Sequence, residues 1–108
     1  MLSEFHEKFG CTISQEILET RIRLLDEEYL EYQEAEMSGD LIKIADALGD
    51  MTYVIFGTAL IHGINLDTVL EEIHRSNMTK EPALTEGGKV YKGDNYSPPD
   101  LEKIIYGN

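Results

Sequence analysis

Basic residues are scarce in this chain, and the shortage excludes one broad class of partner. The 108 residues include 9 Lys and Arg against 21 Asp and Glu, which gives a formal net charge of −12 at pH 7. Contacts to the phosphates of duplex nucleic acid need a basic face. We therefore expect no nucleic-acid partner. A small nucleotide is still admissible, because a bound metal ion inverts the local charge.

Cysteine and long apolar runs are also scarce. The single Cys11 cannot form a disulfide within the chain, which suits a reducing compartment. The N-terminal stretch MLSEFHEKFG lacks the basic leader and apolar core of a signal peptide. The longest mostly apolar stretch, residues 51–64, contains Thr, Gly and His and is too short to span a bilayer. We expect a cytoplasmic protein without a membrane partner.

Proline is absent before Pro82, and the chain up to that point carries the start and stop signals of helices. Thr12-x-x-Gln15 has the form of a capping box, and Gly39 is the residue type that commonly ends a helix. Asp40 is a good N-cap for the segment that follows, which is apolar nearly all round from residue 51, as a central bundle helix is. The expected helices span residues 3–9, about 14–37, 41–62 and 66–78.

The last third of the chain has a different composition. Residues 80–99 contain all three prolines and three glycines without a helical period, and a small hairpin is expected around Gly87-Gly88. Pro99 is expected at the first position of a short last helix, to about residue 106. We expect a single domain, with a helical core over residues 1–79, an irregular loop over 80–99 and a short C-terminal helix over 100–108.

Acidic residues concentrate between residues 26 and 50. This stretch holds nine carboxylates and a single basic residue, Lys43. At about 100° per residue, an apolar seam runs through Leu18, Ile22, Leu25, Tyr29 and Tyr32, and a second strip beside it contains Ile17, Leu24 and Ala35. Glu28 and Glu31 lie inside that second strip.

Two further carboxylates follow the glycine turn. Asp46 and Asp50 are four residues apart and share one face of an otherwise apolar helix. Burying several like charges together is costly unless a cation neutralises them. Carboxylates without Cys or an obligatory His suit Mg²⁺, with Mn²⁺ as the alternative metal. The competing interpretation is an acidic, solvated helix surface.

The basic residues have their own pattern. Four of the nine lie between residues 75 and 92, namely Arg75, Lys80, Lys89 and Lys92. They are either ordinary solubilising loop residues or a cationic arm over an anionic ligand. Glu71-x-x-His74 matches half of a di-iron signature, so a di-metal redox or storage bundle stays open, as does a non-catalytic acidic interaction module.

Several of these segments together resemble a known family. The pattern Glu27-Glu28-x-x-Glu31, the glycine turn and ADALGDMTYVIFGTAL, followed by HRSNMTK and GKVYKGDNYSPPDL, is similar to the MazG-like all-α nucleotide pyrophosphohydrolases. It is most like the small phosphoribosyl-ATP pyrophosphohydrolase-like branch of phages and bacteria. The resemblance implies an all-α helical bundle of the NTP pyrophosphohydrolase type. It further implies completion by oligomerisation to a homodimer or homotetramer, with an irregular C-terminal loop and a short last helix.

The resemblance also implies a reaction and a site. A Mg²⁺-dependent enzyme of this family cleaves a nucleoside triphosphate between the α and β phosphates, and releases a monophosphate and pyrophosphate. The family pattern has Glu at position 47, where this chain has Ala47, and Asp46 is the candidate replacement. The implied metal ligands are Glu28, Glu31, Asp46 and Asp50. The implied catalytic carboxylate is Glu27, and the implied substrate contacts are Tyr53, Asn77, Lys80, Lys89 and Lys92.

Overall fold

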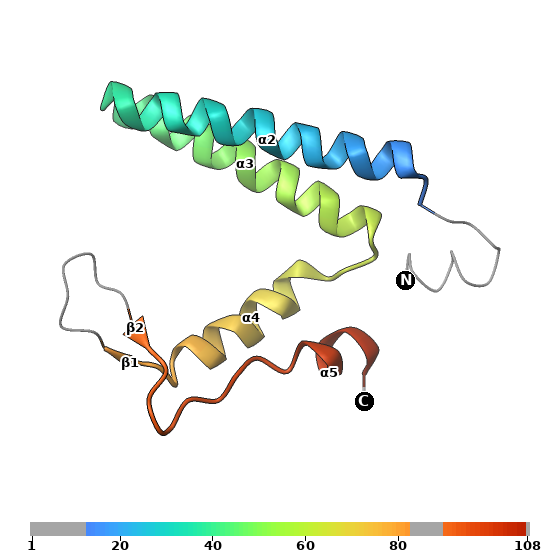
Figure 1. Ribbon diagram of the computed structural model, residues 1–108, viewed down its shortest axis with the longest axis vertical. Helices are drawn as coiled ribbons and strands as arrows, with labels where there is room; N and C mark the ends of the chain where they lie inside the picture. The colour runs from blue at the N-terminus through green and yellow to red at the C-terminus, as the bar shows by residue number, and fades with distance from the viewer. Residues whose placement is uncertain (1–12, 83–89, 108) are drawn as a thin grey trace. The chain divides into compact units, whose positions relative to one another are not determined.

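The structure, a computed structural model, describes residues 13–82 and 90–107 and confirms an all-α fold (Figure 1). The elements are α2 (Gln15–Ser38), α3 (Leu41–Ile61), α4 (Leu66–Asn77), β1 (Glu81–Pro82), β2 (Val90–Tyr91) and α5 (Leu101–Tyr106). The helix expected over residues 3–9 lies outside the described residues. The chain divides into two compact units, Met1–Ile64 and Asn65–Asn108. The single domain expected from the sequence stays a prediction.

The first unit contains a helical hairpin in which α2 and α3 run antiparallel, side by side (Figure 1). Helix α2 begins one residue after Ser14, whose Oγ accepts a hydrogen bond from Ile17 N at 3.1 Å. Ser14 is therefore the N-cap, and Thr12 of the expected capping box lies outside the described residues. Gly39 ends the helix with φ of 69°, a left-handed conformation that glycine adopts without a steric penalty.

The turn after Gly39 leads directly into α3. Asp40 caps this helix as the sequence predicts, since its Oδ1 accepts hydrogen bonds from Ile42 N at 2.9 Å and Lys43 N at 3.4 Å. Ser38 Oγ donates to Ala35 O at 2.6 Å and accepts from Asp40 N at 3.1 Å. These bonds link the end of α2 to the start of α3, so the two helices are held in a tight turn.

The face of α2 that packs on α3 is not the one with the longer apolar seam. The expected apolar seam is largely exposed, with Ile22 at 64% and Tyr29 at 51%. The second strip faces α3 instead, and its Ala35 is buried, as is Ala47 on α3. Small side chains on both helices let the two backbones approach closely. Periodicity locates an apolar stripe but does not say which neighbour covers it.

Helix α3, which its composition predicts to be a central bundle helix, is largely exposed in the single chain. Tyr53 and Leu60 are mostly exposed, and Phe56 is partly so, whereas Ala47 and Ala59 are buried. The helix has 21 residues and a most apolar window with mean hydropathy of 1.4, so by length and composition it could span a membrane. The sequence-based expectation concerned residues 51–64, whereas the helix that meets this criterion begins at Leu41. The core helix of a soluble protein meets the same criterion, so this is weak evidence for a membrane.

The second unit is built on α4, whose N-cap is Asn65. Val69 is buried on this helix, whereas Leu70 is 47% exposed. The expected hairpin is present as two short antiparallel strands, β1 and β2, while residues 83–89 between them lie outside the described part of the chain. Asp100 is the N-cap of α5, so Pro99 precedes the cap and the prediction that it starts the helix is wrong.

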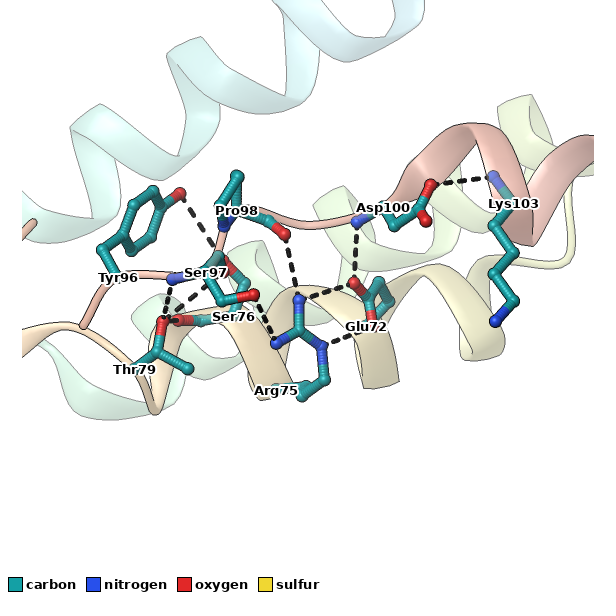
Figure 2. Close-up of polar contacts among 9 residues, drawn as sticks. All are labelled: Glu72, Arg75, Ser76, Thr79, Tyr96, Ser97, Pro98, Asp100 and Lys103. Carbon is teal, nitrogen blue, oxygen red and sulfur yellow. Dashed lines mark hydrogen bonds and ion pairs between the residues drawn. The ribbon is translucent and has the colours of Figure 1, made fainter.

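A polar strap ties the tail of the second unit to α4 (Figure 2). Arg75 donates two hydrogen bonds to the carboxylate of Glu72, at 2.8 and 2.9 Å, and further bonds to Ser97 Oγ and Pro98 O. Glu72 also accepts a bond from Asp100 N at 2.7 Å. Arg75 is therefore compensated by a carboxylate and fixes the tail, rather than forming part of a free cationic arm.

Candidate functional site

Three carboxylates converge where α2 and α3 pack together. One oxygen from each of Glu28, Glu31 and Asp50 lies within 4.8 Å of the other two. Glu28 and Glu31 are three residues apart on α2 and so share the face that contacts α3. The structure thus brings together three of the four carboxylates that the sequence predicts as metal ligands. Their role as ligands stays a prediction.

Glu28 is the most perturbed member of this cluster. Burial raises the pKa of its carboxyl, and the negative charges of Glu31, Asp50 and Glu27 raise it further, as does a hydrogen bond with Glu31. Its Oε2 is buried without a hydrogen-bond partner among the described residues. A buried, unpaired carboxylate oxygen is costly. A cation at this point would satisfy the oxygen and offset the repulsion.

The donor set indicates which cation fits. All three groups are carboxylates, and oxygen ligands of this kind suit hard divalent cations such as Mg²⁺, Mn²⁺ and Ca²⁺. The structure contains no metal, and the residues present fit one. The family pattern and the orphaned Oε2 of Glu28 therefore point to the same place by independent routes.

A pocket of about 250 Å³ adjoins the cluster on the side of the helical turn. Asp46 lines this pocket but is not one of the three converging carboxylates, and it is exposed. Ala47 also lines it and is 5% exposed, so a longer side chain at position 47 would begin at the packed face of α3. Lys43 is the basic residue of the lining. The pocket therefore combines carboxylates with one cation beside the cluster. Its walls are Glu31, Glu34, Ala35, Ser38, Lys43, Asp46, Ala47 and Asp50.

The other predicted site residues of the first unit lie near the cluster but outside it. Glu27 is exposed on α2, next to Glu28. Tyr53 follows Asp50 by three residues, about one helical turn, and is 83% exposed. It is not among the residues that line the described pocket. The catalytic role of Glu27 and the substrate contact of Tyr53 both stay predictions.

The remaining predicted substrate contacts belong to the second unit. Asn77 is exposed at the last position of α4. Lys80 and Lys92 both place their ammonium nitrogen near the ring of Tyr96, at 6.0 and 5.2 Å from its centroid. Lys89 lies outside the described residues. One aromatic ring thus gathers two cationic groups that are twelve residues apart in the sequence, and their role in substrate binding stays a prediction.

Sequence reasoning missed Arg21, which crosses from α2 to α3. Its Nε donates to Thr58 Oγ1 at 3.0 Å and its Nη2 donates to Val54 O at 2.8 Å. A Cβ built on Gly57 would lie 2.7 Å from Arg21 Nη2, so the guanidinium occupies the space that glycine leaves. The sequence shows a glycine at position 57 but does not identify the side chain that lies against it.

Comparisons with known proteins cover the two helices that carry this cluster. A family model described as phosphoribosyl-ATP pyrophosphohydrolase matches residues 2–77, which include the whole carboxylate cluster. An uncharacterized protein of Acanthamoeba polyphaga mimivirus is 38% identical over 117 aligned residues, which cover 96% of this chain and 46% of that protein. The chain therefore spans about half the length of that curated relative.

Proposed function

Because the chain belongs to the phosphoribosyl-ATP pyrophosphohydrolase family, we propose that it is a Mg²⁺-dependent nucleoside triphosphate pyrophosphohydrolase. The family places it among the hydrolases that act on phosphoanhydride bonds of nucleotides. In the proposed reaction, water cleaves a nucleoside or deoxynucleoside triphosphate between the α and β phosphates, and the products are a monophosphate and pyrophosphate. The observation that carries the proposal is the convergence of Glu28, Glu31 and Asp50 around a buried, unpartnered carboxylate oxygen.

The residues of the first unit have complementary parts in this proposal. Glu28, Glu31 and Asp50 hold the divalent ion, with Asp46 as a further acidic group on the pocket wall. When bound, the ion supplies Lewis acidity and a template for the phosphates. Glu27 lies beside the cluster rather than in it, so its carboxylate is free to orient the attacking water and accept its proton.

The second unit supplies groups that suit the rest of the substrate. Asn77, Lys80, Lys89 and Lys92 contact the phosphates in this proposal, and residues 80–99 act as a lid that excludes bulk water. The paired ammonium groups of Lys80 and Lys92 support this role, because clustered cations attract the charge of a polyphosphate. Tyr53, exposed one turn from Asp50, contributes to the wall of the substrate site.

We place the enzyme in the cytoplasm as a homodimer or homotetramer. An apolar groove of about 370 Å³ on the hairpin supports assembly, with Leu18, Ile22, Leu25 and Ile55 among its walls. Several of these side chains are exposed in the single chain. A second copy of the chain would bury them and gain about 25 cal/mol for each Å² of apolar surface removed from water.

A product assay tests the reaction. Each of the eight common ribo- and deoxyribonucleoside triphosphates is incubated with the purified protein and Mg²⁺, Mn²⁺ or EDTA, and pyrophosphate and orthophosphate are measured separately. Pyrophosphate should appear first and only with a divalent ion. Orthophosphate as the initial product, or full activity in excess EDTA, would contradict the proposal.

Two variants link the assay to the cluster. Glu28→Gln and Asp50→Asn should abolish turnover while the far-ultraviolet circular dichroism spectrum stays helical. Without metal their thermal stability should equal or exceed that of the wild type, because each removes like-charge repulsion. Glu19→Gln, on an exposed site of the same helix, is the matched control and should retain turnover. Near-normal activity of Glu28→Gln would show that the ligand assignment is wrong.

The rival di-metal redox bundle has less support. It would use Glu71 and His74 of α4, but in the described part of the chain the converging metal-type group consists of Glu28, Glu31 and Asp50. An iron signal in electron paramagnetic resonance of the purified protein would favour that bundle over the hydrolase.

A further inference from the structure

Arg21 makes the most specific polar contact between α2 and α3. The guanidinium is half-buried, donates to Thr58 Oγ1 and to Val54 O, and fills the space over Gly57. A planar guanidinium with two bonds of fixed direction tolerates little sliding of one helix along the other. The turn through Gly39 sets the register at one end of the hairpin, and this contact holds it near the other end, beyond the carboxylate cluster.

This contact and the carboxylate cluster belong to the same helix register. Seven residues separate Arg21 from Glu28 on α2, and seven separate Asp50 from Gly57 on α3. Seven residues are close to two helical turns, about 10.5 Å of rise, so both pairs lie on the interface, two turns apart. A slip of one residue would move Asp50 by about 1.5 Å along the axis relative to Glu28.

The bonds of Arg21 are not needed to satisfy buried acceptors. Thr58 Oγ1 itself donates to Val54 O at 3.1 Å, within α3. Loss of the guanidinium would therefore leave both acceptor atoms with a partner inside their own helix. The main effect of this contact is therefore to align the two helices, and it is not needed to satisfy their hydrogen-bond acceptors.

We propose that Arg21 is a positioning residue, which fixes the register of α2 on α3 and so sets the convergence of Glu28, Glu31 and Asp50. This inference rests on the proposed function, because it assumes that the cluster binds a divalent ion. It assigns to Arg21 no contact with metal or substrate. Its effect on the cluster passes through the alignment of the two helices.

The test measures Mn²⁺ binding to the full chain by electron paramagnetic resonance, without nucleotide. Arg21→Ala and Arg21→Lys should each weaken Mn²⁺ binding by about 10-fold, the lower end of the loss seen when residues that support metal ligands are removed. Lysine keeps the positive charge but lacks the planar guanidinium with its two bonds of fixed direction. If Arg21→Lys binds Mn²⁺ as weakly as Arg21→Ala, the lost alignment of the helices accounts for the effect, and the lost charge does not. Arg23→Ala removes the same charge from an exposed site of the same helix and should leave binding unchanged.

A double-mutant cycle gives a second, independent readout. Gly57→Ala places a Cβ against the guanidinium and should weaken Mn²⁺ binding in the wild type. In the Arg21→Ala background the obstacle is absent, so the same change should have no further effect. Gly49→Ala on α3 is the control, since its Cβ would meet no atom within 4 Å. If Arg21→Ala does not fold, Arg21→Lys and Gly57→Ala carry the test.

The outcomes separate the inference from the proposed function. A wild type that binds no Mn²⁺ overturns the proposed function and this inference with it. A wild type that binds Mn²⁺, with Arg21→Ala and Gly57→Ala binding equally well, overturns the inference alone. Leu24→Ala removes a half-buried side chain from the same strip of α2 without touching Arg21, so an equal loss of binding in that variant would show a general stability effect and also overturn it.

Discussion

Single residues of the candidate site differ in how directly the structure constrains them. The unpartnered Oε2 of Glu28, together with the raised pKa of the Glu28 carboxyl, indicates where a cation would bind. Asp46 is constrained less, because it lines the adjoining pocket without joining the cluster. The neighbouring Ala47 occupies the packed face where the family pattern has a carboxylate. The two positions therefore offer a direct test of how the site tolerates its missing acid.

We predict that Asp46→Ala weakens Mg²⁺ binding, so that a several-fold higher Mg²⁺ concentration is needed for half-maximal turnover. This result would show that Asp46, from its place on the pocket wall, replaces the missing acid. Ala47→Glu should be tolerated or raise metal affinity, because position 47 lies only about 60° round the helix from Asp50. Mg²⁺ titrations of pyrophosphate release measure both. A fully active Asp46→Ala variant would show that Asp46 is only a polar neighbour.

Glu72 gives a prediction about pH. Its hydrogen bonds from Arg75 and from Asp100 N lower the pKa of its carboxyl from the ordinary 4.5 to about 2. A carboxyl group whose pKa is lowered in the folded state stabilises the fold at pH values above its unfolded-state pKa. This stabilisation is lost as the pH falls through the folded-state pKa. The wild type should therefore lose thermal stability between about pH 4.5 and pH 2, and Glu72→Gln should lose less over that range.

Melting temperatures measured across this pH range for both proteins check the prediction, and a nuclear magnetic resonance titration of the Glu72 carboxyl checks the pKa. Glu71→Gln, the exposed neighbour on α4, is the control and should follow the wild type. A pH dependence in Glu72→Gln equal to that of the wild type would show that the strap contributes little to acid stability.

At the scale of elements, caps and stops were the most predictable features. Gly39 and Asp40 fix helix ends through their own backbone conformation or side chain, so sequence alone locates them. The partner of an element was less predictable, because it depends on the rest of the fold. The seam through Ile22 and Tyr29 is the clearest case, since it is the stronger apolar stripe and yet these two side chains are largely exposed.

The β1–β2 segment and its flanks give the element-scale prediction. Lys80→Ala and Lys92→Ala should each raise KM for triphosphates and lower turnover, because each removes one of two ammonium groups gathered at Tyr96. Each exposed cation–π contact contributes only about 0.5–1 kcal/mol, so the melting temperature should change little. Steady-state kinetics and thermal melts measure the two effects. Lys103→Ala, which removes a lysine of α5, controls for net charge, and an equal rise in KM there would contradict a local role.

The contacts between Arg75 and the tail could not be predicted from the sequence. Ser97 and Pro98 meet Arg75 through a hydroxyl and a backbone carbonyl, and backbone acceptors leave no signature in the sequence. The cluster of basic residues was readable, but which of them already had a carboxylate partner was not. The same holds for Arg21, whose acceptors are a threonine hydroxyl and a backbone oxygen of another helix.

At the scale of the whole molecule, the candidate site was predictable because one hairpin contains it. Glu28 and Glu31 share a face by helical spacing, and a turn of known length fixes where the second helix returns. Groups that depend on the second unit, such as Lys80 and Lys92, lack such a local rule. Assembly depends on surfaces of the whole chain and is therefore argued from exposure.

We predict that Ile22→Glu reduces the oligomer to a smaller species. Ile22 is 64% exposed and lines the apolar groove on the hairpin, and a buried carboxylate there would be unpaired. Size-exclusion chromatography with light scattering measures the mass. Met37→Glu adds the same charge at an 88% exposed apolar residue of α2 outside the groove lining and should leave the mass unchanged. An Ile22→Glu protein with the wild-type mass would place the interface elsewhere.

The short turn through Gly39 also bears on the order of events in folding. It joins the two helices that carry Glu28, Glu31 and Asp50, so the chain between these carboxylates is short and mostly helical. Closing a short loop costs little entropy, and chains dominated by local contacts fold fast. The three acids therefore meet before the last third of the chain, with its longer-range contacts between α4 and the tail, needs to be in place. During synthesis a divalent ion present in the cell could be captured by the emerging hairpin, and its binding energy would then help to select the native alignment of the two helices.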